Sequence, residues 1–301
     1  MRLDDERESS NFENRGSGGF NSAGFGGGGG GLGILGMLVP FVFSKFGCGG
    51  VAVLLVLFLV FGGGLGSLGS MVGGGGQQVA QGPASAPGEL DTTQRTALKV
   101  LGSTERRWGE IFAASNAQYA PPKLVFYKGG GMSGCGAAQS AMGPFYCPAD
   151  QGIYIDTAFF DELRSRYNVP GDFPMAYVIA HEVGHHIQHL EGTAEKVQAA
   201  QQRVSRTRGN ALQVAMELQA DCYAGVWAAR DTNLLEPGDV EEGLAAAQAI
   251  GDDTLQKAAG QRPVPDSFTH GSAAQRQQWL QRGLSTGDPR QCDTFGALGV
   301  G

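Results

Sequence analysis

Apolar residues recur at the spacing of one helix face over much of the chain beyond residue 91. In the first such stretch Leu98, Leu101, Trp108 and Phe112 share a face. Asp91 precedes them at the position where a helix cap is expected. The same periodicity predicts further helices at residues 157–167, 173–190, 194–207, 210–231, 239–250 and 272–284.

Two short runs predict strands. Residues 123–128 and 152–156 are rich in branched and aromatic side chains, and a glycine-rich loop with Cys135 and Cys147 separates them. A small sheet followed by a series of helices is an α+β arrangement. We therefore expect a mostly helical α+β domain with a small sheet.

One stretch is uncharged and long enough to cross a lipid bilayer. Residues 46–65 carry no charged side chain, and about 20 apolar residues span the hydrocarbon core as a helix. We expect a single transmembrane helix within an anchor at 32–68, with Lys45 reaching the near surface. The preceding run at 32–43 is short and contains Pro40, so a hairpin of two spans is the alternative.

The glycine content divides the rest of the chain. Of the 301 residues 50 are glycine, and they gather between residues 16 and 88. Such stretches bury too little side-chain surface to offset the entropy lost on ordering. We expect a disordered head at 1–31, the anchor, a linker at 69–90 and a folded domain at 91–301. That domain is long enough to close its own core.

The charged residues indicate an orientation and exclude one class of partner. Arg2, Arg7, Arg15 and Lys45 precede the span, and the next basic residue is Arg95. The positive-inside rule then predicts a cytoplasmic N-terminus, with the domain on the periplasmic or extracytoplasmic side of the cell membrane. A net charge of −7 disfavours nucleic acid as a partner, because phosphate binding needs a basic surface.

Four cysteines fall inside the predicted domain, at Cys135, Cys147, Cys222 and Cys292. Reduced thiols are one interpretation, and two disulfides with three possible connectivities are the other. An oxidising compartment favours disulfides. We expect Cys135–Cys147 across the glycine-rich loop and Cys222–Cys292 between a helix and the C-terminal tail.

One predicted helix carries the sequence His181-Glu-Val-Gly-His185. Residues four apart share a helix face, so both imidazoles can bind one zinc ion, Zn²⁺. Glu182 lies one position round the helix, where it can reach a zinc-bound water as a general base. A chance match is the alternative, which the helical context disfavours. His186 and His189 are expected at the surface or beside the ligands.

A catalytic zinc site needs a third protein ligand. Glu217 and Asp221 share a face of the helix expected at 210–231, and the residues around them are mostly apolar. Two carboxylates on so apolar a helix need a partner, which disfavours a solvated acidic face. We expect Glu217 to ligate and Asp221 to accept the ring N–H of a ligand histidine. His270 or another acid is the alternative third ligand.

Several longer motifs resemble one family, the bacterial neutral zinc metallopeptidases. They are His181-Glu-Val-Gly-His-His-Ile-Gln188, Met216-Glu-Leu-Gln-Ala-Asp-Cys222, Gly251-Asp-Asp253, Val264-Pro-Asp-Ser-Phe-Thr-His-Gly271 and Gly287-Asp-Pro-Arg-Gln-Cys-Asp-Thr-Phe295. The resemblance covers residues 92–295 and implies a gluzincin-type peptidase, with glutamate as third ligand and aspartate four residues on. The run from Thr269 to Arg276 is similar to the Thr-His-Pro…Arg segment of other gluzincins, with Gly271 in place of proline. There the histidine lies near the substrate carbonyl, which implies a catalytic role for His270.

We therefore expect a membrane-anchored zinc endopeptidase that hydrolyses peptide bonds outside the cytoplasm. Glu182 would transfer the proton, His270 would stabilise the oxyanion, and the substrate would add as a strand beside residues 152–156. The alternatives are a non-catalytic, zinc-stabilised envelope protein that binds other membrane proteins, and a zinc amidase acting on cell-wall peptides. For His270 the alternative is a structural role at the start of the helix expected at 272–284.

Overall fold

The computed structural model describes residues 1–16, 90–167, 169–231 and 233–298. These residues belong to one compact unit, which joins the N-terminal segment to the chain beyond residue 90. The expected anchor at 32–68, with its span at 46–65, lies outside the described residues, as does all but the last residue of the linker. Within the described part, no helix combines the length and the apolar character needed to cross a membrane.

The described residues are mostly helical, with a small sheet, which confirms the predicted α+β composition. The helices are α2 (Thr92–Ala114), α3 (Ala158–Arg166), α4 (Phe173–Leu190), α5 (Thr193–Gln201), α6 (Arg206–Arg230), α7 (Asp239–Ala249), α8 (Asp252–Ala258) and α9 (Ala273–Thr286). α2 begins where the sequence predicts, because the Asp91 side chain accepts from the Gln94 N–H in a capping box.

The main sheet has the strand order β1-β2-β6-β5. β1 (Phe12–Asn14), β2 (Lys123–Phe126) and β6 (Gly152–Ile155) are parallel, and β5 (Phe145–Cys147) is antiparallel to β6. A separate hairpin pairs β3 (Gly130–Ser133) with β4 (Gly136–Gln139). The expectation that substrate adds beside β6 is therefore wrong, because β6 is hydrogen-bonded on both sides. β5 is the edge strand at this end.

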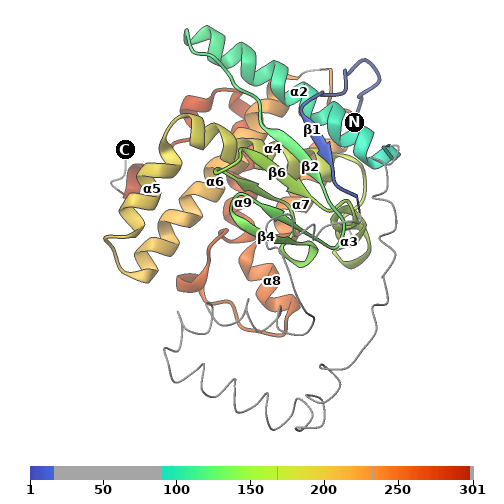
Figure 1. Cartoon of the computed structure of the whole chain (residues 1–301). Helices are drawn as coiled ribbons and strands as arrows, with labels where there is room; N and C mark the ends of the chain where they lie inside the picture. Colours follow the sequence, from blue (N-terminus) through green and yellow to red (C-terminus); the bar gives the residue numbers. More distant parts are fainter. Residues whose placement is uncertain (17–89, 168, 232, 299–301) are drawn as a thin grey trace, which may run out of the picture. The chain divides into compact units, whose positions relative to one another are not determined.

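The first sixteen residues depart from the predicted disordered head. Phe12 pairs with Leu124 in the parallel ladder, so the N-terminal segment supplies an edge strand of the sheet. Leu3 is only 9% exposed and belongs to the main core. Figure 1 shows α4 behind the sheet and α2 close to β1. Residues 17–31 of the predicted head lie outside the described residues.

Glycines let the three central helices approach closely. A Cβ on Gly184 of α4 would lie 2.9 Å from the Cα of Ala220 on α6, which explains this helix-interior glycine. Between α6 and α9, a Cβ on Gly283 would lie 2.0 Å from the carbonyl oxygen of Cys222. The same close approach involves Gly225, whose Cβ would lie 2.3 Å from the carbonyl oxygen of Leu280. These contacts set the distances between the helices that carry the site.

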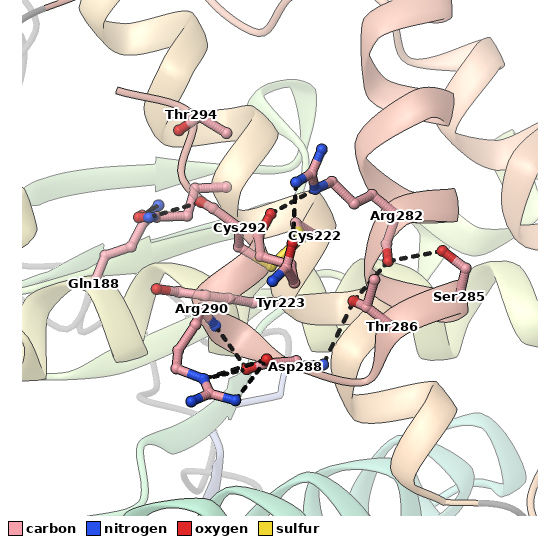
Figure 2. The surroundings of a disulfide bond; sticks show 12 residues. Gln188, Cys222, Tyr223, Arg282, Ser285, Thr286, Asp288, Arg290, Cys292 and Thr294 are labelled. Atoms are coloured by element: carbon pink, nitrogen blue, oxygen red, sulfur yellow. Dashed lines mark hydrogen bonds and ion pairs between the residues drawn. A yellow bond between two sulfur atoms is a disulfide. The ribbon is translucent and has the colours of Figure 1, made fainter. Parts of the chain in front are cut away.

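Both predicted disulfides are confirmed, with Cys135 bonded to Cys147 and Cys222 bonded to Cys292. The second bond joins α6 to the C-terminal tail (Figure 2). Its two residues are 0% and 1% exposed. The tail is also held by Gln219, whose Nε2 donates to the carbonyl oxygen of Cys292 at 3.1 Å. The helix that carries the expected third ligand is therefore fixed covalently and by hydrogen bonds.

Candidate metal centre

α4 and α6 bring three candidate ligand atoms together. Glu217 Oε2 lies 3.2 Å from His181 Nε2 and 3.5 Å from His185 Nε2. Ligand atoms held about 2.0–2.1 Å from a tetrahedral zinc ion lie roughly 3.3–3.4 Å from one another. The three residues therefore fit a zinc ion in both donor chemistry and spacing. They form one of the possible metal-binding groups among the described residues.

Asp221 fixes the ring of His181. Its Oδ1 lies 2.8 Å from His181 Nδ1, which donates in the neutral tautomer and leaves Nε2 free to bind metal. The same oxygen accepts from the hydroxyl of Tyr177 at 2.6 Å. Arg276 of α9 donates to both oxygens of the carboxylate. Asp221 therefore stays anionic although it is 0% exposed, because each of its oxygens has a partner.

Gln188 has the corresponding role for His185. His185 Nδ1 lies 2.9 Å from Gln188 Oε1 and donates to it. The amide cannot turn round, because its Nε2 donates to the carbonyl oxygen of Met216 at 2.7 Å. Gln188 is fully buried. One ligand histidine is thus oriented by a carboxylate and the other by a neutral amide, a difference that the sequence motif alone does not reveal.

The charges of the three ligands depend on one another. Burial lowers the pKa of His181, but Asp221 and Glu217 outweigh burial and raise it to about 9. Burial opposes ionisation of Glu217, yet the two histidines hold its pKa well below the ordinary value. Without metal, His181 therefore carries a proton at neutral pH. A zinc ion must displace that proton, so zinc affinity rises with pH.

A cleft of about 560 Å³ opens over these ligands. Glu182 lines it beside His181 and His185, as does Tyr146 of the edge strand β5. Much of the rest of the lining is apolar or aromatic, including Met142, Phe145, Phe159, Tyr167, Val178 and Met216. The base expected from the sequence and the two ligand histidines therefore share one accessible space with a strand edge.

His270 also lines this cleft, and it arrives from the loop before α9. Asp252 holds that loop: its Oδ2 accepts from the backbone N–H of Thr269 and of His270 at 2.7 Å, and from Gly271 at 3.1 Å. The other oxygen lies 3.3 Å from His270 Nδ1. Asp253 accepts from the N–H of Ala273 at 2.7 Å. Asp252 and Asp253 thus hold the loop that carries His270 through hydrogen bonds to its backbone.

Asp252 also changes the charge of His270. Its hydrogen bond to the ring raises the pKa of His270, and Glu217 of α6 acts in the same direction, while burial and Arg276 oppose. With Nδ1 facing Asp252, the ring can donate from Nε2 only when both nitrogens carry protons. A raised pKa keeps that form present to higher pH.

The remaining two histidines of α4 lie apart from the ligand atoms. His186 is fully buried, which differs from the surface position that was one of its expected places. It donates from Nε2 to the carbonyl oxygen of Ala120 at 2.6 Å and accepts at Nδ1 from Tyr146 at 3.0 Å. Burial lowers its pKa, which suits this neutral form. His189 pairs instead with Glu195 at 2.6 Å.

Sequence reasoning missed the roles of Gln188, Asp252 and Arg276. Gln188 and Asp252 lie within motifs that carried the family resemblance, and Arg276 ends the run that is similar to the Thr-His-Pro…Arg segment. The available signal was position: Gln188 follows His185 by one helical turn, and Asp252 begins a helix. Asp252 and Arg276 have partners far away in sequence, and the amide of Gln188 is fixed by Met216 on another helix, so these contacts required the folded chain.

A helix with two histidines and a glutamate, next to a second glutamate from another helix and beneath an open cleft, is the arrangement of a zinc metallopeptidase site. The comparison of sequences agrees: the chain belongs to the family described as "putative neutral zinc metallopeptidase", whose profile matches residues 1–295.

Two relatives show how far the likeness extends. The chain is 44% identical to the protein YpfJ of Escherichia coli K12 over 300 residues, which is 98% of this chain and 99% of the relative. It is also 44% identical to the protein Rv2575 of Mycobacterium tuberculosis H37Rv over 196 residues, which is 61% of this chain and 65% of that protein. No solved structure matches the chain.

Proposed function

We propose that this protein is a zinc-dependent endopeptidase that hydrolyses peptide bonds outside the cytoplasm. The observation that carries the proposal is the convergence of His181 Nε2, His185 Nε2 and Glu217 Oε2 under an open cleft that Glu182 also lines. A purely structural zinc site is closed by four protein ligands, whereas a hydrolytic site keeps a position open. The three-residue group and its cleft support the hydrolytic class.

The chain's own residues would divide the chemistry as follows. Bound zinc supplies Lewis acidity, which lowers the pKa of water and polarises a carbonyl group. Glu182 accepts the proton of the attacking water and passes it to the leaving amine. His270, doubly protonated and held by Asp252, donates from Nε2 to the oxygen on which negative charge develops. Asp221 and Gln188 keep the ligand histidines in the tautomer that leaves Nε2 free.

The edge strand β5 supports a peptide as the substrate. Phe145 and Tyr146 of β5 line the cleft, and β5 is the last strand of the sheet on that side. An extended peptide can add to such an edge through main-chain hydrogen bonds. The apolar and aromatic lining favours large hydrophobic side chains next to the scissile bond. This position replaces the one expected beside β6.

The two disulfides support a location outside the cytoplasm. Disulfides persist in oxidising environments and are rare in the cytoplasm, and both cysteine pairs of the described domain are bonded. The apolar residues 46–65, which lie outside the described residues, support contact with a membrane.

The test compares the wild-type chain with Glu182→Gln, both purified with zinc and offered a library of quenched fluorescent peptides. We expect cleavage by the wild type, and a loss of about 10²–10⁴-fold in Glu182→Gln with zinc content and melting temperature retained. If zinc-loaded wild-type protein cleaves no peptide, the proposal gives way to a zinc-stabilised binding protein. Cleavage of cell-wall peptides alone would instead indicate the amidase.

A further inference from the structure

The N-terminal segment, residues 1–16, is built into the same fold as the metal centre. Its strand β1 pairs in parallel with β2, and the ladder continues beyond the strand on both sides. The N–H of Leu124 donates to the carbonyl oxygen of Asn11 at 2.9 Å, and the N–H of Arg15 donates to that of Phe126 at 2.9 Å. The segment therefore contributes a strand to the main sheet and is not a separate head.

The same segment packs closely on α2. The N–H of Ser9 donates to the carbonyl oxygen of Leu98 at 2.9 Å, and Asn11 Nδ2 donates to Glu105 at 2.8 Å. The fit depends on Gly102, because a Cβ there would lie only 2.3 Å from the carbonyl oxygen of Arg7. Such an approach of backbone to backbone leaves no room for a side chain. The surface of α2 is shaped for this segment.

A third set of contacts holds the beginning of the segment. The N–H of Arg2 donates to the carbonyl oxygen of Leu234 at 2.8 Å. The backbone nitrogen of Met1 lies 2.9 Å from Asp172 and 3.2 Å from Asp239. The contacts therefore extend from the loop after α6 to the sheet, along the whole length of the described segment.

From these contacts we infer that residues 1–16 and residues 90–298 lie on the same side of the cell membrane, and that this side is outside the cytoplasm. A chain that crosses a bilayer once leaves its two ends on opposite sides, and strand pairing cannot form through a bilayer. The single crossing expected from the sequence is therefore incompatible with the contacts between these two described parts.

This inference decides between two expectations that the fold makes incompatible. The basic residues predict a cytoplasmic N-terminus, whereas the disulfides favour a domain outside the cytoplasm. Two of those basic residues belong to ion pairs of the folded unit: Arg15 Nε lies 2.8 Å from Glu13, and Arg2 lies 3.8 Å from Glu236. The Cys222–Cys292 bond is sealed in the core. Because Arg2 and Arg15 have partners within the fold, their charge is weaker evidence of membrane orientation than the buried disulfide. The N-terminal segment is therefore assigned to the compartment of the disulfides, outside the cytoplasm.

The test introduces one new cysteine at a time into the full chain, expressed in spheroplasts. The fifth cysteine of the sequence, Cys48, is replaced by serine so that the new cysteine has the one thiol outside the two disulfides. Arg2→Cys reports on the N-terminal segment and Arg164→Cys on the domain, since both side chains are more than half exposed, at 58% and 53%. We expect a membrane-impermeant maleimide to label both before detergent is added. If only one of the two cysteines is labelled, the two parts do not lie on the same side of the membrane. If neither is labelled, they do not lie outside the cytoplasm. This readout does not depend on catalytic activity.

A pair of glycine variants on α2 tests whether the segment is docked in the intact protein. Gly102→Ala would force the backbone at Arg7 away, while a Cβ at Gly109 would have nothing within 4 Å, so Gly109→Ala serves as the matched control. Hydrogen exchange of residues 9–15 in the detergent-extracted full chain should quicken by at least about tenfold in Gly102→Ala and stay unchanged in Gly109→Ala. Equal exchange in both variants and the wild type would overturn the docking on which the inference rests.

Discussion

Arg276 of α9 binds both oxygens of Asp221 on α6, from Nε to Oδ2 at 2.8 Å and from Nη2 to Oδ1 at 2.8 Å. The two side chains are 3% and 0% exposed. Because Asp221 also faces His181 Nδ1, the ion pair connects the position of α9 to the orientation of a ligand histidine. The loop with His270 leads directly into α9. The buried Arg276–Asp221 ion pair therefore links the metal ligands to the loop that carries His270.

Asp221→Asn should destabilise the protein strongly. It keeps the shape of the side chain but leaves the guanidinium of Arg276 buried without a counter-charge, which typically costs about 3–5 kcal/mol. Zinc affinity should fall by about 10–100-fold, because an orienting partner is weakened. Urea unfolding and zinc titration measure the two effects. The control is Glu162→Gln in the exposed pair with Arg166, which should leave the unfolding midpoint nearly unchanged.

The zinc-free protein should lose stability in acid through this same residue. Burial opposes ionisation of Asp221, but Arg276 and His181 outweigh it and lower the pKa from 3.8 to about 2. A group with a lowered pKa in the folded state stabilises above its unfolded pKa and loses that contribution as pH falls. The free energy of unfolding should therefore decline by about 2 kcal/mol between pH 4 and pH 2. An equally steep decline in Asp221→Asn would assign the effect to other carboxylates.

Zinc binding should release protons and should depend on Glu217 more than on Asp221. With the pKa of His181 near 9 in the zinc-free protein, at least one proton must leave at pH 7. Calorimetric titration in buffers of different ionisation enthalpy measures that release. Glu217→Ala removes a ligand and should lower affinity further than Asp221→Ala, which removes an orienting group. A Glu217→Ala protein that binds zinc as tightly as the wild type would assign the third ligand elsewhere.

Catalysis should fail on the alkaline side as His270 loses its proton. Its pKa is raised through the hydrogen bond to Asp252, so kcat should fall as pH rises through a value above 6.5. Asp252→Asn should shift this decline of kcat to lower pH, because the neutral amide no longer favours the charged ring of His270. Asp253→Asn weakens the contacts with the Ala273 N–H and with Lys257 but leaves the contact between Asp252 and the His270 ring in place. It is therefore the control for a loosened loop, and it should not shift this decline of kcat to lower pH.

A double-mutant comparison separates positioning from general damage. If Asp252 acts through His270, Asp252→Asn should add little to the loss of kcat already caused by His270→Ala. Fully additive losses would show that the two residues act independently. An unchanged kcat in His270→Ala, with a lowered melting temperature, would support the structural alternative.

The close approach of α6 and α9 should tolerate no side chain at Gly225. Gly225→Ala places a Cβ 2.3 Å from the carbonyl oxygen of Leu280, whereas Gly209 on the same helix has only the flexible Gln201 side chain at 4.0 Å. Gly209→Ala should stabilise the helix by up to about 1 kcal/mol. Gly225→Ala should destabilise by about 1–3 kcal/mol through overpacking. Thermal unfolding of the two variants measures the difference, and equal melting temperatures would contradict the close contact.

The elements that the sequence predicts well are those whose signals are local. α4 begins and ends at the predicted residues, because its apolar face is continuous and Pro174 lies in its first turn. α6 begins four residues earlier than expected, since Ser205 caps it by accepting from the N–H of Arg208. That capping signal is itself local, so the earlier start could have been predicted from the sequence.

The elements that the sequence does not predict depend on contacts between distant residues. β1 has three residues and no apolar alternation, so only its pairing with β2 makes it a strand. The short strand β5 and the β3–β4 hairpin lie in a glycine-rich stretch whose composition predicts a loop. Gln188 follows His185 by one helical turn, but the contact that fixes its amide comes from Met216 on α6. Short-range patterns do not predict such contacts between distant residues.

The two disulfides have different relations to the solvent, and this imposes an order on maturation. Cys135 is exposed, so its bond with Cys147 can be formed or exchanged after the chain has folded. Cys222 and Cys292 are sealed between α6 and the tail, where no oxidant or thiol can reach them. That bond must close while the chain is still assembling, before the tail covers it. A chain that completes folding under reducing conditions would keep both thiols trapped, and a later change to oxidising conditions could not form the bond.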